Sequence, residues 1–287
     1  VVIAIIALLI SILLPSLSAA REQSRTVVCL SNLRQLSHGW HMYADDSEDI
    51  SVPGRYANRA PKGPGNPQNW YDVGNGRKYR PRWIATMGAY VGVYAFNTPS
   101  EDDRQDYDNL VYRCPTAPQR MDERNHAYGY NHQFLGNARQ TNGKYHNFPV
   151  NRTRISMFAS TVMAGDSMGT GAGVATNDRL PYQSNGTDFA AEGNHAWTLD
   201  PPRLSATSDR GTGDAGSPRT AVDPRHSGRS NVVYCDGHGS TQTPYQLGYR
   251  VLPTGAFVDL ESMPEDPPSN RLFGGNGRDD DAPDLPQ

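Results

Sequence analysis

The chain contains little lysine and little cysteine. Only three of its 287 residues are lysines, and it has no basic cluster with interleaved aromatic side chains. With a net charge of −3, this composition offers no case for nucleic-acid binding. The glycine-rich segment 169–173 has no lysine, so it lacks the pattern of a phosphate-binding loop. The three cysteines form no Cys-x-x-Cys pair, which argues against zinc on thiolates. No nucleophile–base pair or metalloprotease helix motif is visible, so we predict that the chain is not an enzyme.

Charge is absent from the first twenty residues, although the mean hydropathy of the whole chain is −0.67. The run from Val1 to Leu14 is apolar apart from Ser11, and Pro15 follows it. About twenty apolar residues in a helix span the ~30 Å hydrocarbon layer of a membrane. Residues 1–20 are therefore predicted to be a membrane anchor or the buried stalk of an assembly. A proline inside a helix removes one backbone donor, so we expect a kink or local unwinding at Pro15.

A cleaved signal peptide is the alternative explanation of this run. No basic cluster precedes it, and Ser18-Ala19-Ala20 offers the one candidate cleavage site. The helical pattern also continues beyond that site, which favours an uncleaved helix.

From residue 21 to 46 the apolar positions take on helical spacing. Steps of four, three, four and three place one stripe of side chains on a single helix face: Cys29, Leu33, Leu36, Trp40 and Tyr43. Residues 1–50 thus predict one helix of about 45 residues, roughly 65–70 Å long. Its second half should pack this stripe on a globular head, while its first half projects away.

The rest of the chain predicts a β-rich head over 51–260, and the fold class is α+β. With 28 glycines and 22 prolines, its elements should be short. The Asp236-Gly237 pair predicts a tight turn between two of them. An antiparallel sheet packed on the amphipathic half of the helix is the expected result. The candidate strands are 82–85 and 89–94, for both of which a helical start is the alternative, and 110–113, 126–130, 161–166, 230–235 and 238–243.

Three segments predict loops or a tail. Residues 53–81 and 168–225 are rich in glycine and polar residues and are interpreted as loop insertions. The tail 261–287 holds seven acidic residues and five prolines, a composition that is typical of disorder. An ordered tail would have to be fixed against another surface, for which a neighbouring subunit is one candidate.

The string from Val1 to Pro15 resembles the N-terminal helix of type IV pilins and type II secretion pseudopilins. Pro15 falls where pilins carry the proline at which their helix loosens on assembly. That family's peptidase site, methylated first residue and glutamate would lie upstream of Val1, so about seven more mature residues are expected there. The resemblance implies that the helix face used in assembly includes Val1, Ile3, Ile6, Leu9, Leu13 and Pro15.

Further motifs are similar to one branch of these prepilin-like proteins, named for a C-terminal H-X9-DG motif. Here His226 is followed by nine residues and then Asp236-Gly237. The other matching segments are 28–36 with 43–46, Tyr112-Arg113-Cys114-Pro115, and Tyr128-Gly129-Tyr130-Asn131. The head of this branch has no assigned activity, so the resemblance implies architecture more than chemistry.

The resemblance implies a pilin-like structural subunit of an extracellular filament. It would form a helical homo-oligomer through its apolar helix and expose its head. Prepilin peptidase and a pilus or secretion assembly machinery would be its partners, and the inner membrane would hold it before assembly. The alternative is a minor pseudopilin of a type II secretion-like system, or a membrane-anchored surface binding module. Nucleic acid is not an expected partner.

The cysteines leave three possibilities open in an exported chain. A Cys29–Cys114 disulfide would staple the helix to the head, and both residues lie in family-like motifs. A Cys114–Cys235 bond would instead join two strands. The third possibility is three buried thiols that act as small apolar groups.

The H-X9-DG motif also allows more than one interpretation. The favoured one is a polar network in which His226, Asp236 and Gly237 hold the hairpin. A structural Ca²⁺ bound by Asp236 with Asp166 is the second, because calcium prefers oxygen ligands. No other cofactor is expected, and a catalytic role for His226, Asp236 or His238 is the least favoured.

Overall fold

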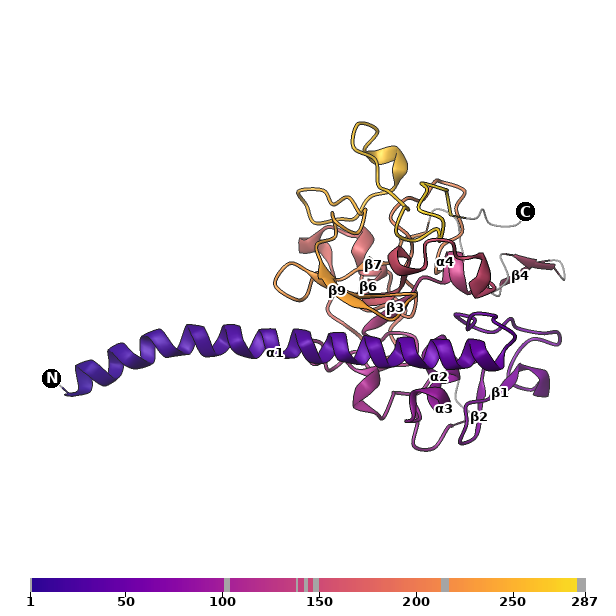
Figure 1. Cartoon of the computed structure of the whole chain (residues 1–287), viewed down its shortest axis with the longest axis horizontal. Helices are drawn as coiled ribbons and strands as arrows, with labels where there is room; N and C mark the ends of the chain where they lie inside the picture. The colour runs from indigo at the N-terminus through magenta and orange to yellow at the C-terminus, as the bar shows by residue number, and fades with distance from the viewer. Residues whose placement is uncertain are drawn as a thin grey trace.

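The computed structural model describes residues 2–100, 104–137, 139–141, 144–146, 150–212 and 217–282. Val1, which was predicted to belong to the assembly face, lies outside them. The fold is α+β, with one long N-terminal helix and an antiparallel sheet. Figure 1 shows the helix running through the head, with the larger part of the head above it and a smaller part below it, and projecting far beyond the head on one side.

Helix α1 extends over Val2–Asp46 without interruption. Its 45 residues correspond to about 67 Å at 1.5 Å per residue. The local unwinding predicted at Pro15 is wrong, since the helix continues through it and curves only gently toward its N-terminus (Figure 1). A proline removes a single N–H donor, and the surrounding leucines and alanines are strong helix formers.

The main sheet contains β3 (Tyr128–Tyr130), β6 (Val162–Gly169), β8 (Ser230–Tyr234) and β9 (Gly239–Gln242) in that order. A short strand, β7 (Ala221–Val222), pairs with β6, and all pairings are antiparallel. The four strands predicted at 126–130, 161–166, 230–235 and 238–243 are therefore confirmed. The predicted turn between β8 and β9 is also present, and Gly237 adopts a φ of 90° there, a value that favours glycine.

Three predicted strands are wrong. Residues 82–85 and 89–94 fall on two short helices, α2 (Trp83–Thr86) and α3 (Gly88–Val91), so the helical alternative holds for both. Residues 110–113 form a 3₁₀ turn, Leu110–Tyr112. α3 and the 3₁₀ turn pack on α1, whose Gly39 would place an added Cβ only 2.6 Å from Val91 Cγ2, and α2 joins the same core cluster. Packing against a helix thus overrides their strand propensity.

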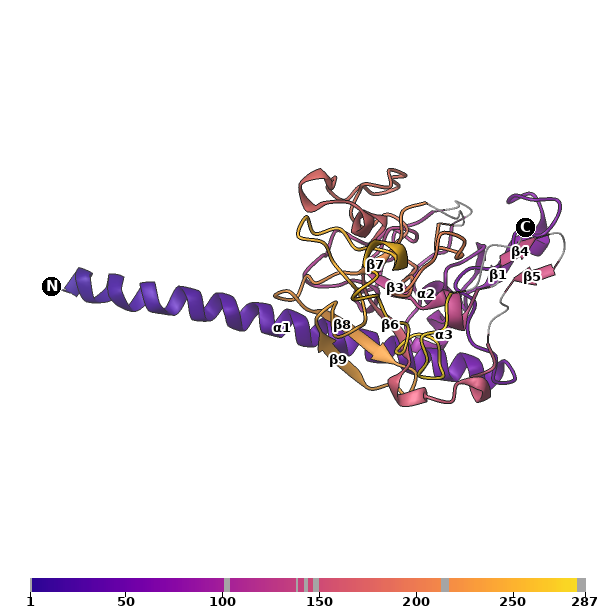
Figure 2. The same ribbon diagram turned by 90° about the horizontal axis from the view of Figure 1, so that it is seen from above.

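The sheet lies between two apolar layers. On one face Met163 and Val233 join the core cluster that includes Trp40 of α1. On the other face Val162 and Val232 join a cluster of C-terminal residues. β6 and β8 are buried along their whole length because both faces are covered. β8 and β9 lie across α1 (Figure 2).

The predicted loop regions hold short elements. The first contains a small hairpin, β1 (Trp70–Asp72) with β2 (Arg77–Tyr79). The second begins within β6 and includes β7, so its predicted start is wrong. The head also contains α4 (His132–Leu135), a hairpin of β4 (Arg139–Thr141) with β5 (Lys144–His146), and several short 3₁₀ turns.

The tail packs on the head of its own chain as far as Ala282, rather than needing a neighbouring subunit. Phe273 is fully buried there, and the Val162 N–H donates to the Leu272 carbonyl at 2.7 Å. The acidic side chains also find partners. The Asp279 carboxylate accepts hydrogen bonds from the Ser269 hydroxyl at 2.6 Å and from the Asn270 N–H at 2.9 Å. The composition of the tail did not predict that it is ordered, because composition carries no information about contacts with distant residues.

Candidate functional site

Among the described side chains at the start of α1, none belongs to either apolar core cluster of the head. Large apolar side chains between Val2 and Leu17 are 49% to 84% exposed. They include the predicted assembly residues Ile3, Ile6, Leu9 and Leu13. We call residues 2–20 the stalk. The helix is long and apolar enough to cross a membrane, a property that a signal sequence near an N-terminus shares.

The second part of α1 is embedded in the head along the predicted stripe. Cys29, Leu33, Leu36 and Trp40 are fully buried, and the half-buried Tyr43 packs against the same core. The Trp40 indole N–H donates to the Tyr130 hydroxyl at 2.9 Å. The head-packing face is therefore confirmed.

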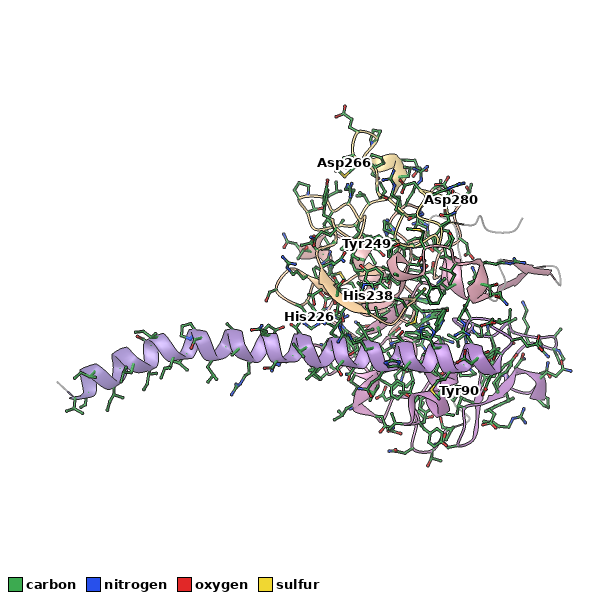
Figure 3. The ribbon with its side chains drawn as sticks, viewed as in Figure 1. Tyr90, His226, His238, Tyr249, Asp266 and Asp280 are labelled. Atoms are coloured by element: carbon green, nitrogen blue, oxygen red, sulfur yellow. The ribbon has the colours of Figure 1, made fainter. Side chains whose placement is uncertain are left out.

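Four side chains meet where α1 enters the head, and we call them the thiol–His–Asp cluster. They are Cys29 of α1, Cys114 after the 3₁₀ turn, Asp166 of β6 and His226 between β7 and β8. One nitrogen, oxygen or sulfur atom from each lies within 4.8 Å of the other three, and all four residues are buried. Figure 3 labels His226 beside α1, on the side of the head from which the stalk projects.

Local backbone structure positions two members of this cluster. His226 opens a tight turn in which Ser227 and Gly228 have φ values of 53° and 80°. His226 and Arg229 exchange backbone hydrogen bonds of 3.0 and 3.1 Å across the turn. Asp166 lies in the buried strand β6, and its Oδ2 accepts the Asn231 N–H of β8 at 2.7 Å. The sheet therefore fixes the carboxylate, and the turn brings the imidazole to it.

Asp166, rather than Asp236, is the partner of His226. The His226 Nε2 lies 3.2 Å from Asp166 Oδ2. Asp236 instead binds within its own exposed turn, accepting from the His238 N–H at 3.0 Å and lying 2.6 Å from His238 Nδ1. The predicted network joining His226 to Asp236 and Gly237 is therefore wrong. The nine-residue spacing spans strand β8, whose two ends these residues flank.

The predicted calcium pair of Asp236 and Asp166 is wrong for the same reason. Asp166 contacts β8 at Asn231, five residues before Asp236. At about 3.3 Å per residue along a strand, the two carboxylates lie on the order of 15 Å apart. One ion cannot bind both, since calcium–oxygen distances are about 2.3–2.6 Å.

The cysteines are three free, buried thiols, which is the third of the predicted possibilities. The Cys29–Cys114 disulfide is thus not formed in the structure, although both sulfurs belong to the cluster. The Cys29 thiol donates to Asp166 Oδ1 at 3.2 Å, and Cys114 Sγ lies 3.9 Å from His226 Nε2. Each sulfur is directed at a polar partner. Cys235 lies outside the cluster in the apolar core, so the Cys114–Cys235 pairing is also wrong.

Charge in the cluster is balanced by mutual contacts. The hydrogen bond with Cys29, the His226 contact and the Arg225 guanidinium lower the pKa of Cys114 to about 5. Burial chiefly raises the pKa of Cys29. For His226, Asp166 and Cys114 outweigh the opposing effect of burial and raise the pKa to about 9. Burial opposes ionisation of Asp166, but Arg225, His226 and the Asn231 N–H lower its pKa overall.

This geometry does not form a cysteine–histidine–carboxylate catalytic triad. Such a triad uses one ring nitrogen for the nucleophile and the other for the carboxylate. Here the same nitrogen, Nε2 of His226, faces both Cys114 and Asp166. The side chains of His226 and Asp166 are fully buried, so a substrate has no access to them.

A second site is a strongly cationic cavity of about 320 Å³ in the head. No acidic side chain of the described residues lines it. Burial, followed by four of its arginines, lowers the pKa of His195 in its wall to about 2. Sequence reasoning missed this site because its cations are dispersed over about 70 positions. They are Arg55, Lys62, Arg80, Arg82, Arg104 and Arg124.

Comparison of the chain with protein-family models, with curated proteins and with solved structures finds no match. The stalk, the thiol–His–Asp cluster and the cationic cavity are therefore the features on which a function can be proposed.

Proposed function

We propose that the chain is a structural subunit of an extracellular type IV pilus-like filament, assembled through its stalk with the head exposed. The observation that carries this proposal is the exposed apolar surface of α1. Ten large apolar side chains between Val2 and Leu17 are at least 49% exposed, and the stalk has no charge. A surface of this kind needs a lipid or protein environment.

The energy of covering the stalk favours assembly. Full burial of one Val, Leu or Ile side chain is worth about 1.5–3 kcal/mol. Ten half-exposed side chains therefore supply on the order of 10 kcal/mol before the entropy of association is subtracted. Packing against identical helices provides that burial outside a membrane and leaves the polar head in water.

The shape of the subunit suits a fibre. A stalk that leaves one side of the head can pack against the stalks of other copies in a head-to-tail arrangement. Such contacts generate an open helical polymer when the rotation between copies does not close. The likeness of Val1–Pro15 and the H-X9-DG motif to pilin-like proteins supports the same assembly. On that likeness, prepilin peptidase and an assembly machinery act on the chain, and the inner membrane holds it beforehand.

Electron microscopy of sheared surface material, with mass spectrometry of the fibres, tests this proposal. Abundant fibres made of this polypeptide support it. Leu13→Asp, in the stalk, should abolish the fibres, because a charge in an apolar core costs about 3 kcal/mol per subunit. The matched control is Leu110→Asp, the same change at a residue that is 77% exposed on the head. Fibres that survive Leu13→Asp unchanged would contradict the proposal.

The second candidate is a minor pseudopilin or a membrane-anchored binding module, and the cationic cavity favours it. Six cations around about 320 Å³ suit a small anion with carboxylate, phosphate or sulfate groups. If this candidate is correct, the chain should be present only in trace amounts in the membrane and should form no fibres. It should also bind inorganic phosphate saturably. Arg80→Gln, in the cavity wall, should weaken phosphate binding about tenfold. Arg25→Gln, on exposed α1 outside the cavity, is the control.

A further inference from the structure

We propose that the thiol–His–Asp cluster is a tetrahedral zinc site, with Cys29, Cys114, Asp166 and His226 as its ligands. The four side chains come from four separate parts of the fold and meet in the buried interior. Each contributes one atom of a type that zinc binds, namely thiolate sulfur, imidazole nitrogen or carboxylate oxygen. The inference is independent of filament formation.

The distances between ligand atoms match a tetrahedral zinc complex. Zn–S bonds of about 2.3 Å and Zn–N or Zn–O bonds of about 2.0–2.1 Å place neighbouring ligands roughly 3.3–3.8 Å apart. Here the Cys29 sulfur lies 3.2 Å from Asp166 Oδ1, and the Cys114 sulfur 3.9 Å from His226 Nε2. The His226 Nε2 is 3.2 Å from Asp166 Oδ2. The ligand atoms all lie within 4.8 Å of one another, so shifts of up to about 1 Å would place all four around one ion.

The orientation of His226 is that of a zinc ligand. Its Nδ1 lies 3.1 Å from the Thr26 hydroxyl, which already donates its proton to the Glu22 carbonyl at 3.0 Å. Thr26 can therefore only accept, so Nδ1 carries the proton. In the neutral ring this leaves the lone pair of Nε2 directed into the cluster. A hydrogen bond to the non-ligating nitrogen is the usual support of a zinc-bound histidine.

The charges of the four ligands and of Arg225 also balance those of a divalent ion. Two thiolates and the Asp166 carboxylate supply three negative charges. A zinc ion supplies two positive charges, and Arg225, whose Nη2 lies 3.5 Å from Asp166 Oδ1, supplies the third. A buried group of charges is stable only when it is compensated in this way. Without zinc, a proton on His226 Nε2 faces the Asp166 carboxylate at 3.2 Å, and zinc binding would release that proton.

The ligand types favour zinc over calcium. Soft thiolate ligands select zinc and related transition metals, whereas calcium takes six to eight oxygen ligands. Four protein ligands leave no open coordination position, which is typical of a structural site. The ion would join α1 to the 3₁₀ turn region, to β6 and to the β7–β8 turn. That position lies where the stalk leaves the head, so zinc would fix the angle between them.

Metal analysis of the full chain, purified in detergent under reducing conditions, tests the proposal. We expect about one zinc ion per chain, and a chelator that removes it should lower the melting temperature of the head. Replacement by Co²⁺ should give the intense thiolate-to-metal absorption of a tetrahedral two-sulfur site. A protein that lacks zinc and fails to bind either ion after reduction would overturn the proposal. So would a Cys29–Cys114 disulfide in the native, unreduced protein, detected by mass spectrometry.

Single substitutions assign the ligands. Cys114→Ser and His226→Gln should each lower the bound zinc to below about a tenth of an ion per chain. Cys235→Ala is the matched control, because Cys235 is equally buried but lies outside the cluster. It should keep the full metal content. Zinc binding that survives Cys114→Ser would overturn the assignment. If a ligand variant fails to fold, the Co²⁺ spectrum of the unmodified chain still decides.

Discussion

The two halves of α1 form one continuous helix but have opposite surroundings. In the stalk, large apolar side chains are about half exposed or more on every side, and no charge interrupts them. From Cys29 to Ala44, one face is buried, whereas the opposite face is exposed at Ser31, Arg34, Gln35, His38 and Met42. The same backbone geometry therefore serves two purposes. Side-chain pattern alone decides whether a helix segment packs within its own chain or requires an outside partner.

The comparison predicts that the stability of the head depends on the embedded half of α1 and not on the stalk. Trp40→Ala should lower the free energy of unfolding by about 3–5 kcal/mol, because it leaves a large cavity in the core. It also removes the 2.9 Å hydrogen bond to Tyr130. Chemical denaturation in detergent, followed by tryptophan fluorescence, measures this loss.

Leu13→Ala in the stalk is the control for that measurement. Its side chain is 62% exposed and touches no part of the head core, so the change should be below about 0.5 kcal/mol. Equal losses from the two variants would show that the stalk and the head unfold as one unit.

A second prediction is that pH dependence arises in the head, since the stalk has no titratable side chain. Burial, with Arg82 and Arg225 nearby, lowers the pKa of His126 from 6.5 to about 3. As the pH falls below 6.5, His126 of the unfolded chain therefore binds a proton before His126 of the folded chain does. His126 supports the fold above that pH, and by pH 5 about 2 kcal/mol of stability should be lost.

His126→Gln should remove this part of the pH dependence. The difference in unfolding free energy between pH 7 and pH 5 should shrink by about 2 kcal/mol in the variant. His38→Gln, at an exposed position on α1, is the control and should leave the difference unchanged. A pH profile that both variants alter equally would contradict the assignment to His126.

A smaller effect is expected at Asn32, which ties the embedded half of α1 to the 3₁₀ turn. Its side-chain amide donates to the Leu110 carbonyl at 3.2 Å and to the Arg113 carbonyl at 3.0 Å. Asn32→Ala leaves both carbonyls without this donor and should cost about 1–2 kcal/mol. Ser31→Ala, at the neighbouring exposed position, should cost little in the same thermal unfolding experiment.

The smallest effect on the head is expected from Pro15→Ala. The substitution restores one backbone N–H to the stalk helix, where a proline costs roughly 3 kcal/mol of local helix stability. Hydrogen exchange of amides near residue 15 should slow down, while the melting temperature of the head stays the same. A shift of that melting temperature would show that the two halves of α1 are coupled more strongly than their contacts indicate.

Local patterns allowed part of this structure to be predicted. The stripe from Cys29 to Tyr43 follows from helical spacing, and the hairpin around Gly237 follows from turn chemistry. The short apolar runs near Trp83 and Leu110 were predicted as strands in error. In such short runs, strand propensity is outweighed by the surface on which they pack.

The thiol–His–Asp cluster could not be predicted from spacing. Cys29 and His226 are almost 200 positions apart, and the absence of Cys-x-x-Cys suggested that no thiolate site exists. The motif joins His226 and Asp236 in the sequence, but the nine residues between them include strand β8, which separates them. One feature of the sequence is consistent with the cationic cavity, namely that 24 of the 27 basic residues are arginines.

The sequence by itself determined the stalk and the face of α1 that meets the head. Both depend on neighbours along one helix, and water excludes an uncharged apolar segment whatever the rest of the chain does. Only the tertiary structure decided which groups face one another inside the head. The partners of Asp166 and the arginines around the cavity come from distant segments. Sheet register and close packing, rather than separation along the chain, bring them together.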